Sequence, residues 1–131
     1  MFKRIDHIEI VTDKLEPTIA FYTQVLGFTV GRRDRIPQPD SAAVLHVAYL
    51  GLGGTTLELI WYDGVPVAPE PAREHLGYRM MALEVDDMKE ALAYLESKGI
   101  KASWGPVVRD GYGRAEIEDP NGYRIELRHW F

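Results

Sequence analysis

The chain has 131 residues, of which 46% are hydrophobic, with a formal net charge of −5 and no cysteine. This length suits a single domain, spanning residues 1–131, with a proper hydrophobic core. The absence of cysteine excludes disulfides, thiolate zinc sites and cysteine nucleophiles. The acidic balance, with no basic run longer than Arg32-Arg33, disfavours nucleic acid as a partner, because nucleic-acid binding needs a concentrated positive surface.

The sequence shows no sign of a membrane or export segment. No apolar run approaches the roughly 18 residues that suggest a membrane helix. The N-terminus, M-F-K-R-I-D-H, lacks the apolar core of a signal peptide. We therefore expect a cytoplasmic protein with no membrane partner.

An internal repeat organises the chain. H-I-E-I-V-T-D, from His7, precedes a helical pattern that ends in L-G-F, and M-M-A-L-E-V-D-D, from Met80, precedes one that ends in K-G-I. Each half later has a short strand with a central glutamate, Glu58 in T-L-E-L-I and Glu126 in R-I-E-L-R. The repeat thus pairs His7 with Met80 and Glu58 with Glu126, and it predicts one supersecondary unit per half.

The first half reads as a strand, a helix and three strands. The ranges we expect are 4–11, 15–26, 29–32, 43–50 and 55–61. In the first strand, Ile8 and Ile10 alternate with His7 and Glu9, so the two pairs should face opposite sides of the sheet. Asp13 is in position to cap the helix.

The second half repeats this order. A strand at 80–85 is followed by a helix that ends at Gly99 and by strands at 102–104, 114–118 and 124–128. Either Asp86 or Asp87 caps the helix, and D-P-N-G at Asp119–Gly122 predicts a hairpin turn. Each half therefore has the order βαβββ.

These patterns predict an α+β fold of two tandem βαβββ modules, residues 1–64 and 74–131. The connector between them contains Pro66, Pro69 and Pro71 and has no periodicity of its own. Neither module can bury much surface alone. We therefore expect the strands to form one curved mixed sheet around a concave site, with the helices on the outer face.

The sheet face away from the helices carries an unusual set of polar residues. Its expected members are His7, Glu9, Thr56, Glu58, Met80, Glu84, Arg124, Glu126 and Arg128. One imidazole among several carboxylates suits a hard or borderline divalent cation. A single solvent-facing glutamate is usually just a surface residue, and surface solvation is the simpler interpretation of Glu9 and Glu84. The matched places of Glu58 and Glu126 favour a site.

The chain resembles the vicinal oxygen chelate superfamily, which includes glyoxalase I, bleomycin-resistance proteins and extradiol dioxygenases. The motifs that carry the resemblance are His7–Asp13, F-Y-T-Q-V-L-G-F at Phe21–Phe28, L-E-L at Leu57–Leu59, Gly77–Asp87, and E-D-P-N-G-Y-R-I-E-L at Glu118–Leu127. The resemblance covers essentially the whole chain and is closest to the glyoxalase I-like lyases.

The resemblance implies metal ligands at His7, Glu58, Met80 and Glu126. The family usually has histidine where this chain has Met80, and a thioether is a poor ligand for Ni²⁺, Zn²⁺, Mn²⁺ or Mg²⁺. Arg79 beside it adds positive charge and is expected to point to the opposite face.

Three arrangements of the site remain open. His7, Glu58 and Glu126 form a three-ligand set for a divalent ion (Ni, Zn, Mn, Mg or Fe), or another histidine replaces the missing ligand, or no metal binds. The candidate replacements are His46, His75 and His129.

The resemblance implies a lyase or isomerase that moves a proton at a carbon next to a carbonyl through an enediolate-type intermediate. Glu126 is the candidate base and Glu58 its pseudo-symmetric partner. The alternative is a metal-free binding or drug-resistance protein of the bleomycin-resistance type. An extradiol dioxygenase, which needs a His-His-Glu iron triad, is disfavoured by Met80.

Two further expectations concern partners and loops. Family members of this length often dimerise, so we expect a homodimer that binds a small-molecule substrate or ligand. Tyr112 lies in the D-G-Y-G run and Arg114 directly follows it; both belong either to a segment that closes over a substrate or to a plain loop. Trp61, Trp104 and Tyr49 supply either pocket walls or core packing.

Overall fold

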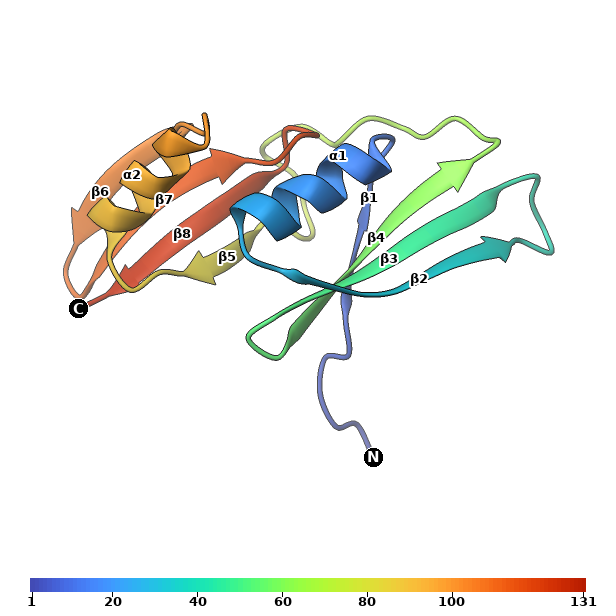
Figure 1. Cartoon of the computed structure of the whole chain (residues 1–131), viewed down its shortest axis with the longest axis horizontal. Helices are drawn as coiled ribbons and strands as arrows, with labels where there is room; N and C mark the ends of the chain where they lie inside the picture. Colours follow the sequence, from blue (N-terminus) through green and yellow to red (C-terminus); the bar gives the residue numbers. More distant parts are fainter. The chain divides into compact units, whose positions relative to one another are not determined.

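The strands pair into two four-stranded mixed sheets, each with its own helix (Figure 1). The computed structural model describes residues 1–131, which divide into two compact units, Met1–Pro69 and Glu70–Phe131. The division falls within the Pro-rich connector. The α+β class and the two tandem βαβββ repeats are confirmed.

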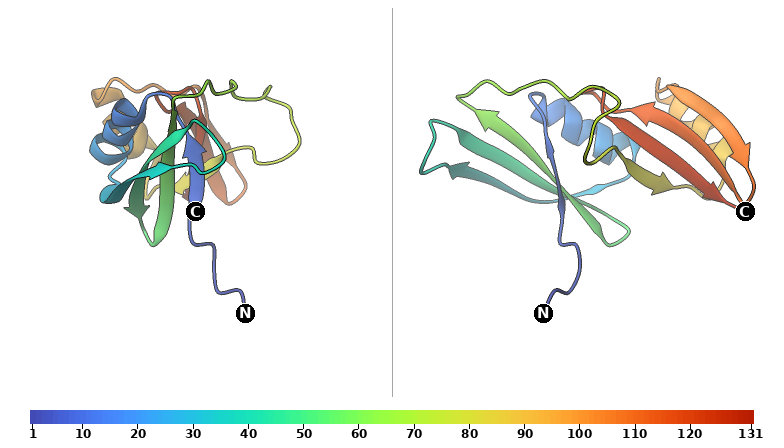
Figure 2. Two further views of the ribbon diagram at one scale, coloured as in Figure 1. Left: turned by 90° about the vertical axis from the view of Figure 1, so that its right-hand side faces the viewer. Right: turned by 180° about the vertical axis from the view of Figure 1, so that it is seen from behind.

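In the first unit, the first strand of the chain pairs with the last strand of the unit. Its elements are β1 (Ile8–Val11), α1 (Leu15–Ala20), a π-helical segment η1 (Phe21–Val25), β2 (Thr29–Pro37), β3 (Val44–Leu52) and β4 (Thr55–Asp63). The sheet order is β1-β4-β3-β2, with β1 parallel to β4 and the other pairs antiparallel. The residues before β1 lead away from this sheet (Figure 2).

The second unit repeats this topology. Its elements are β5 (Met81–Glu84), α2 (Met88–Ser97), β6 (Trp104–Arg109), β7 (Tyr112–Glu118) and β8 (Arg124–Trp130). The order is β5-β8-β7-β6, with β5 parallel to β8. Glu58 lies opposite Glu9 in its parallel pair, and Glu126 lies opposite Ala82. The register therefore confirms that Glu58 and Glu126 are equivalent.

Alternation along the strands separates two faces in each unit. In the second unit, Ile117, Ile125 and Leu127 are buried on the face covered by α2 (Figure 1). The intervening residues Glu116 and Glu126 therefore belong to the opposite face. In the chain as described, no helix is long and apolar enough to cross a membrane.

Several predicted strand limits are wrong. β1 begins at Ile8, so His7 lies just before it. The segments expected at 29–32 and 102–104 become β2 and β6, which extend to Pro37 and Arg109. Both are edge strands with an irregular register, and an edge strand tolerates Gly, Pro and charged residues that obscure the sequence pattern. Tyr112, expected in a closing segment or a plain loop, is instead the first residue of β7.

The two helix starts differ in their capping. Asp13 does not cap α1: the N-cap position is Lys14, which makes no side-chain capping bond. Instead, the Lys14 N–H donates to Thr12 Oγ1 at 2.9 Å. At α2, Asp87 Oδ1 accepts from the Glu90 N–H at 2.8 Å, so Asp87 is the cap.

Candidate functional site

His7 and Glu58 meet on the first unit's sheet. The distance from His7 Nε2 to Glu58 Oε2 is 2.9 Å, and Glu9 Oε1 lies 3.4 Å from the same nitrogen. Glu58 is buried, at 7% exposure, whereas Glu9 is exposed. The three residues meet because β1 runs parallel beside β4, with Glu9 directly opposite Glu58. The His7–Glu58 half of the predicted site is thus a physical cluster.

The donor atoms of this cluster fit a divalent ion. His7, Glu9 and Glu58 each offer one ligand atom, and these atoms all lie within 4.8 Å of one another. One imidazole nitrogen and two carboxylate oxygens suit Zn²⁺, Ni²⁺, Mn²⁺ or Fe²⁺. Strand alternation placed Glu9 on the same face as His7, but from the sequence we interpreted it as a solvated surface residue. What identifies Glu9 as part of the cluster is its register opposite Glu58, and that register depends on the pairing of β1 with β4.

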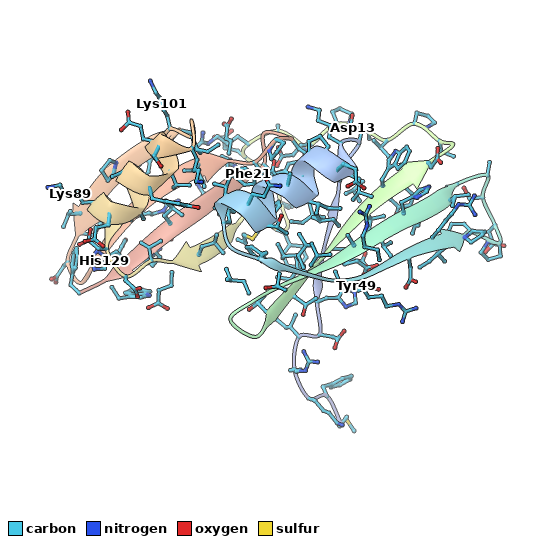
Figure 3. The ribbon with its side chains drawn as sticks, viewed as in Figure 1. Asp13, Phe21, Tyr49, Lys89, Lys101 and His129 are labelled. Atoms are coloured by element: carbon cyan, nitrogen blue, oxygen red, sulfur yellow. The ribbon has the colours of Figure 1, made fainter.

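Two neighbours flank the cluster. Asp6 Oδ2 lies 3.0 Å from His7 Nδ1, and this hydrogen bond raises the pKa of His7 above its ordinary value. A carboxylate on one ring nitrogen fixes the ring orientation, as it does for metal-bound histidines. Tyr49, which is labelled in Figure 3, lies on β3 and is paired with Glu58 in the register of β3 and β4. Burial and the negative charge of Glu58 raise the pKa of Tyr49, so the tyrosine remains a neutral donor.

Glu126, in the second unit, is held by arginines. Arg114 Nε donates to Glu126 Oε2 at 2.7 Å, and Arg128 Nε donates to Oε1 at 2.7 Å. Glu126 is buried, at 7% exposure. Met80, the counterpart of His7, is half-buried just before β5. The second copy of the repeat therefore carries a carboxylate bound to two guanidinium groups, where the first carries a carboxylate bound to an imidazole.

The prediction for Arg79 is wrong. Its Nη2 lies 3.8 Å from Glu116 Oε1, and Glu116 pairs with Glu126 across β7 and β8. Arg79 therefore reaches the face that carries Glu126. Residue 79 precedes β5, so strand alternation does not determine the direction of its side chain.

The three other histidines have partners of their own. His46 Nε2 lies 3.2 Å from Asp63 Oδ2, and its ring stacks on Trp61 with centroids 4.8 Å apart. His129 Nδ1 accepts from the Met88 N–H at 3.3 Å, at the start of α2 (Figure 3). None of the three, His75 included, belongs to the cluster of His7, Glu9 and Glu58.

Comparison of the whole sequence with known protein families gives a match. Residues 4–127 match the family described as the Glyoxalase/Bleomycin resistance protein/Dioxygenase superfamily. The chain belongs to this superfamily. The match includes both copies of the repeat and the residues at His7, Glu58, Met80 and Glu126.

Individual members of the superfamily match nearly the whole of this chain. A lactoylglutathione lyase of Salmonella typhimurium is 32% identical, over 95% of this chain and 90% of the relative. A probable chloroplastic lactoylglutathione lyase of Arabidopsis thaliana is 31% identical over 95% of this chain, which spans 35% of that longer relative. The crystal structure of a glyoxalase family protein from Enterococcus faecalis superposes with a TM-score of 0.77 at 32% identity, covering 97% of this chain and 98% of that one.

Proposed function

We propose that the protein is a glyoxalase I-like, metal-dependent lyase or isomerase that moves a proton at a carbon next to a carbonyl. The observation that carries the proposal is the contact of 2.9 Å between His7 Nε2 and Glu58 Oε2, with Glu9 beside them. Membership of the superfamily and the lactoylglutathione lyase names of relatives at 31% and 32% identity support the reaction class.

His7 and Glu58 are the proposed core of the metal site. Two residues are candidates for the third ligand: Glu126, by resemblance to the family, and Glu9, by its distance to His7. When bound, a divalent ion polarises a carbonyl oxygen of the substrate and stabilises the negative charge that develops there.

The proton transfer is assigned to carboxylates of this chain. Glu126 is the proposed base that removes the proton next to the carbonyl, and Glu58 is its partner in returning a proton. Arg114 and Arg128 fix the position of both Glu126 oxygens. Asp6 does the same for His7. Fixed geometry matters because proton transfer requires hydrogen-bond reach between donor and acceptor.

One observation favours a second candidate function, a metal-free small-molecule-binding or drug-resistance protein. Met80 offers only a thioether, and the oxygens of Glu126 already accept hydrogen bonds from two arginines. A metal ion at Glu126 would have to compete with these guanidinium groups. In a metal-free binding protein, Glu126 keeps its hydrogen bonds to both arginines.

Metal analysis of the purified protein separates the two functions. We expect about one divalent ion per chain in the wild type, and loss of that ion in His7→Ala and Glu58→Ala. Comparing Glu9→Gln with Glu126→Gln identifies the third ligand, because only the ligand's variant loses metal. Glu84→Gln, at an exposed glutamate on β5, is the matched control. Wild-type protein that stays metal-free after incubation with each ion would exclude the metal-dependent enzyme and favour the binding protein.

The base assignment has its own test. In a lactoylglutathione lyase assay run in deuterated water, Glu126→Gln should abolish proton exchange at the carbon next to the carbonyl, while Glu84→Gln retains it. Exchange that is undiminished in Glu126→Gln refutes the role of Glu126.

A further inference from the structure

Five arginines gather around two buried carboxylates in the second unit. They are Arg73, Arg79, Arg114, Arg124 and Arg128, and the carboxylates are Glu116 and Glu126. β7 and β8 supply both carboxylates and three of the arginines. The other two arginines reach the cluster from the segment before β5. We call this group the arginine cluster.

Glu116 is the centre of the arginine cluster. It is only 2% exposed, and four guanidinium groups lie within 4 Å of its oxygens. Arg114 donates at 2.7 Å and Arg73 at 3.4 Å, while Arg79 and Arg124 approach to 3.8 and 3.9 Å. One buried carboxylate needs one cation to balance its charge. The other guanidinium groups exceed that requirement.

The excess of positive charge extends over the whole cluster. Five arginines against two glutamates leave three positive charges. Each guanidinium offers five N–H donors, far more than two carboxylates can accept. Arg124 shows this most directly, because its side chain is only 12% exposed and its Nη1 is buried without a hydrogen-bond partner. Buried polar atoms are almost always satisfied, so this unpaired donor adds to the surplus of donors over acceptors in the cluster.

Aromatic rings restrict the arginines at the edges of the cluster. The Arg114 guanidinium lies 5.0 Å from the ring centroid of Trp104. The Arg128 guanidinium lies 4.1 Å from Tyr112 and 4.9 Å from Trp130. Such contacts hold a guanidinium plane in place, so the donors are oriented before a ligand arrives.

We propose that the arginine cluster is a binding site for an anionic group of a small molecule, a carboxylate or a phosphate. Guanidinium groups bind both through paired, charge-assisted N–H···O bonds. Glu126 belongs both to this cluster and to the proposed metal-dependent activity, so the two proposals share one residue. They are tested separately, because none of the arginines is a proposed metal ligand and the anion is measured on metal-free protein.

The test uses inorganic phosphate and succinate as separate probes on the metal-free protein, at constant ionic strength set with sodium chloride. We expect saturable binding by calorimetry, and shifts of the indole N–H signals of Trp104 and Trp130 in NMR spectra. Trp61, which stacks on His46 in the first unit, is the internal control and should not shift. The probe that binds more tightly identifies the anion class.

Two variants test the residues. Arg124→Gln and Arg79→Gln should each weaken binding about tenfold or more, which corresponds to losing one hydrogen bond between charged groups. Arg79 is exposed, so its variant preserves the test if Arg124→Gln fails to fold by circular dichroism. Arg35→Gln, at an exposed arginine on β2, makes the same charge change and should bind as the wild type.

The failure of this proposal is distinct from failure of the metal site. It is overturned if neither probe saturates, if the probes shift Trp61 but neither Trp104 nor Trp130, or if Arg79→Gln binds as tightly as Arg35→Gln. Each of these results can be obtained without any metal or enzymatic turnover.

Discussion

His7 is held between carboxylates, and this position determines its protonation. The hydrogen bond that His7 donates to Asp6, with smaller contributions from Glu9 and Glu58, raises the pKa of His7 although burial opposes the shift. Because the pKa is raised in the folded state, the imidazolium stabilises the metal-free protein fully below the pKa of an unfolded histidine, about 6.5. That contribution is lost as the pH rises through the raised pKa.

We predict that Asp6→Asn lowers the pKa of His7 toward the ordinary histidine value. The reason is that Asp6 supplies the largest part of the shift. An NMR titration of the ring protons of His7 in metal-free protein measures the change. The signals of His129, which belongs to the other unit, are the reference. A His7 titration that is the same in both proteins contradicts the assignment.

A second ion pair joins α1 to β2. Arg33 hydrogen-bonds to Glu16 and lowers the pKa of that carboxyl. Both side chains are largely exposed, so solvent screening limits their contribution to less than about 1 kcal/mol. A lowered pKa stabilises the fold above the unfolded value, about 4.3, and the contribution disappears as the pH falls through the folded pKa.

We therefore expect Glu16→Gln to lower the free energy of unfolding by a few tenths of a kcal/mol at neutral pH, and by nothing at pH values below the folded pKa. Urea unfolding at several pH values measures this difference. A deficit that persists undiminished in acid would show that the loss is not electrostatic.

At the scale of elements, the start of α2 gives a quantitative prediction. Asp87 accepts the Glu90 N–H, whereas the adjacent Asp86 is exposed and makes no capping bond at this helix. Asp87→Ala should lower the free energy of unfolding by about 1 kcal/mol, the usual cost of losing an N-cap. Asp86→Ala, the matched control, should change it by less than about 0.5 kcal/mol. Equal losses from the two substitutions in urea unfolding would contradict the cap assignment.

The order of elements was predictable because the repeat and the two periodicities are local properties of the sequence. The limits of β2 and β6 were not, since Gly31, Arg32 and Pro106 interrupt the pattern. Pairing with a neighbouring strand, which extends both elements, is a tertiary effect. The same holds for the start of α1, where the hydroxyl of the buried Thr12 takes the place expected for Asp13.

Candidate site residues also divide into those that the local sequence identifies and those that depend on tertiary structure. His7 and Glu58 were predictable because strand alternation and the repeat identify them without tertiary information. The arginine cluster was not, because long side chains such as Arg73 and Arg79 reach Glu116 from outside any regular element. The repeat thus preserves the topology of both units, while their chemistry differs: imidazole and carboxylates in the first, guanidinium groups around carboxylates in the second.

Self-association is a prediction at the scale of the whole molecule. Leu76 and Tyr78 are fully exposed, each at 100%. Exposed apolar side chains that lie close together, rather than singly, mark interaction surfaces, and these two are two residues apart in the chain. We expect a homodimer by sedimentation equilibrium, weakened by the double substitution Leu76→Ser and Tyr78→Ser. Phe2→Ser, at an exposed aromatic residue of the first unit, is the control. A wild-type protein that sediments as a monomer refutes the expectation.

Metal binding should also be visible in the stability of the two units. An ion that binds only the folded protein stabilises it by about 2.7 kcal/mol at a concentration 100 times its dissociation constant. Thermal unfolding should therefore shift upward with added ion, return with a chelator, and stay unchanged in His7→Ala.

Hydrogen exchange then shows which parts of the chain the ion holds together. If Glu9 is the third ligand, added ion should increase amide protection in β1 and β4 and leave β8 unchanged, because His7, Glu9 and Glu58 all belong to the first unit. If Glu126 is the third ligand, protection must extend to β8, since opening either unit would then break a metal bond. Glu126→Gln should remove the protection of β8 only in the second case. Unchanged exchange throughout the chain, with ion present in excess, contradicts both assignments and leaves the metal-free binding protein as the supported function.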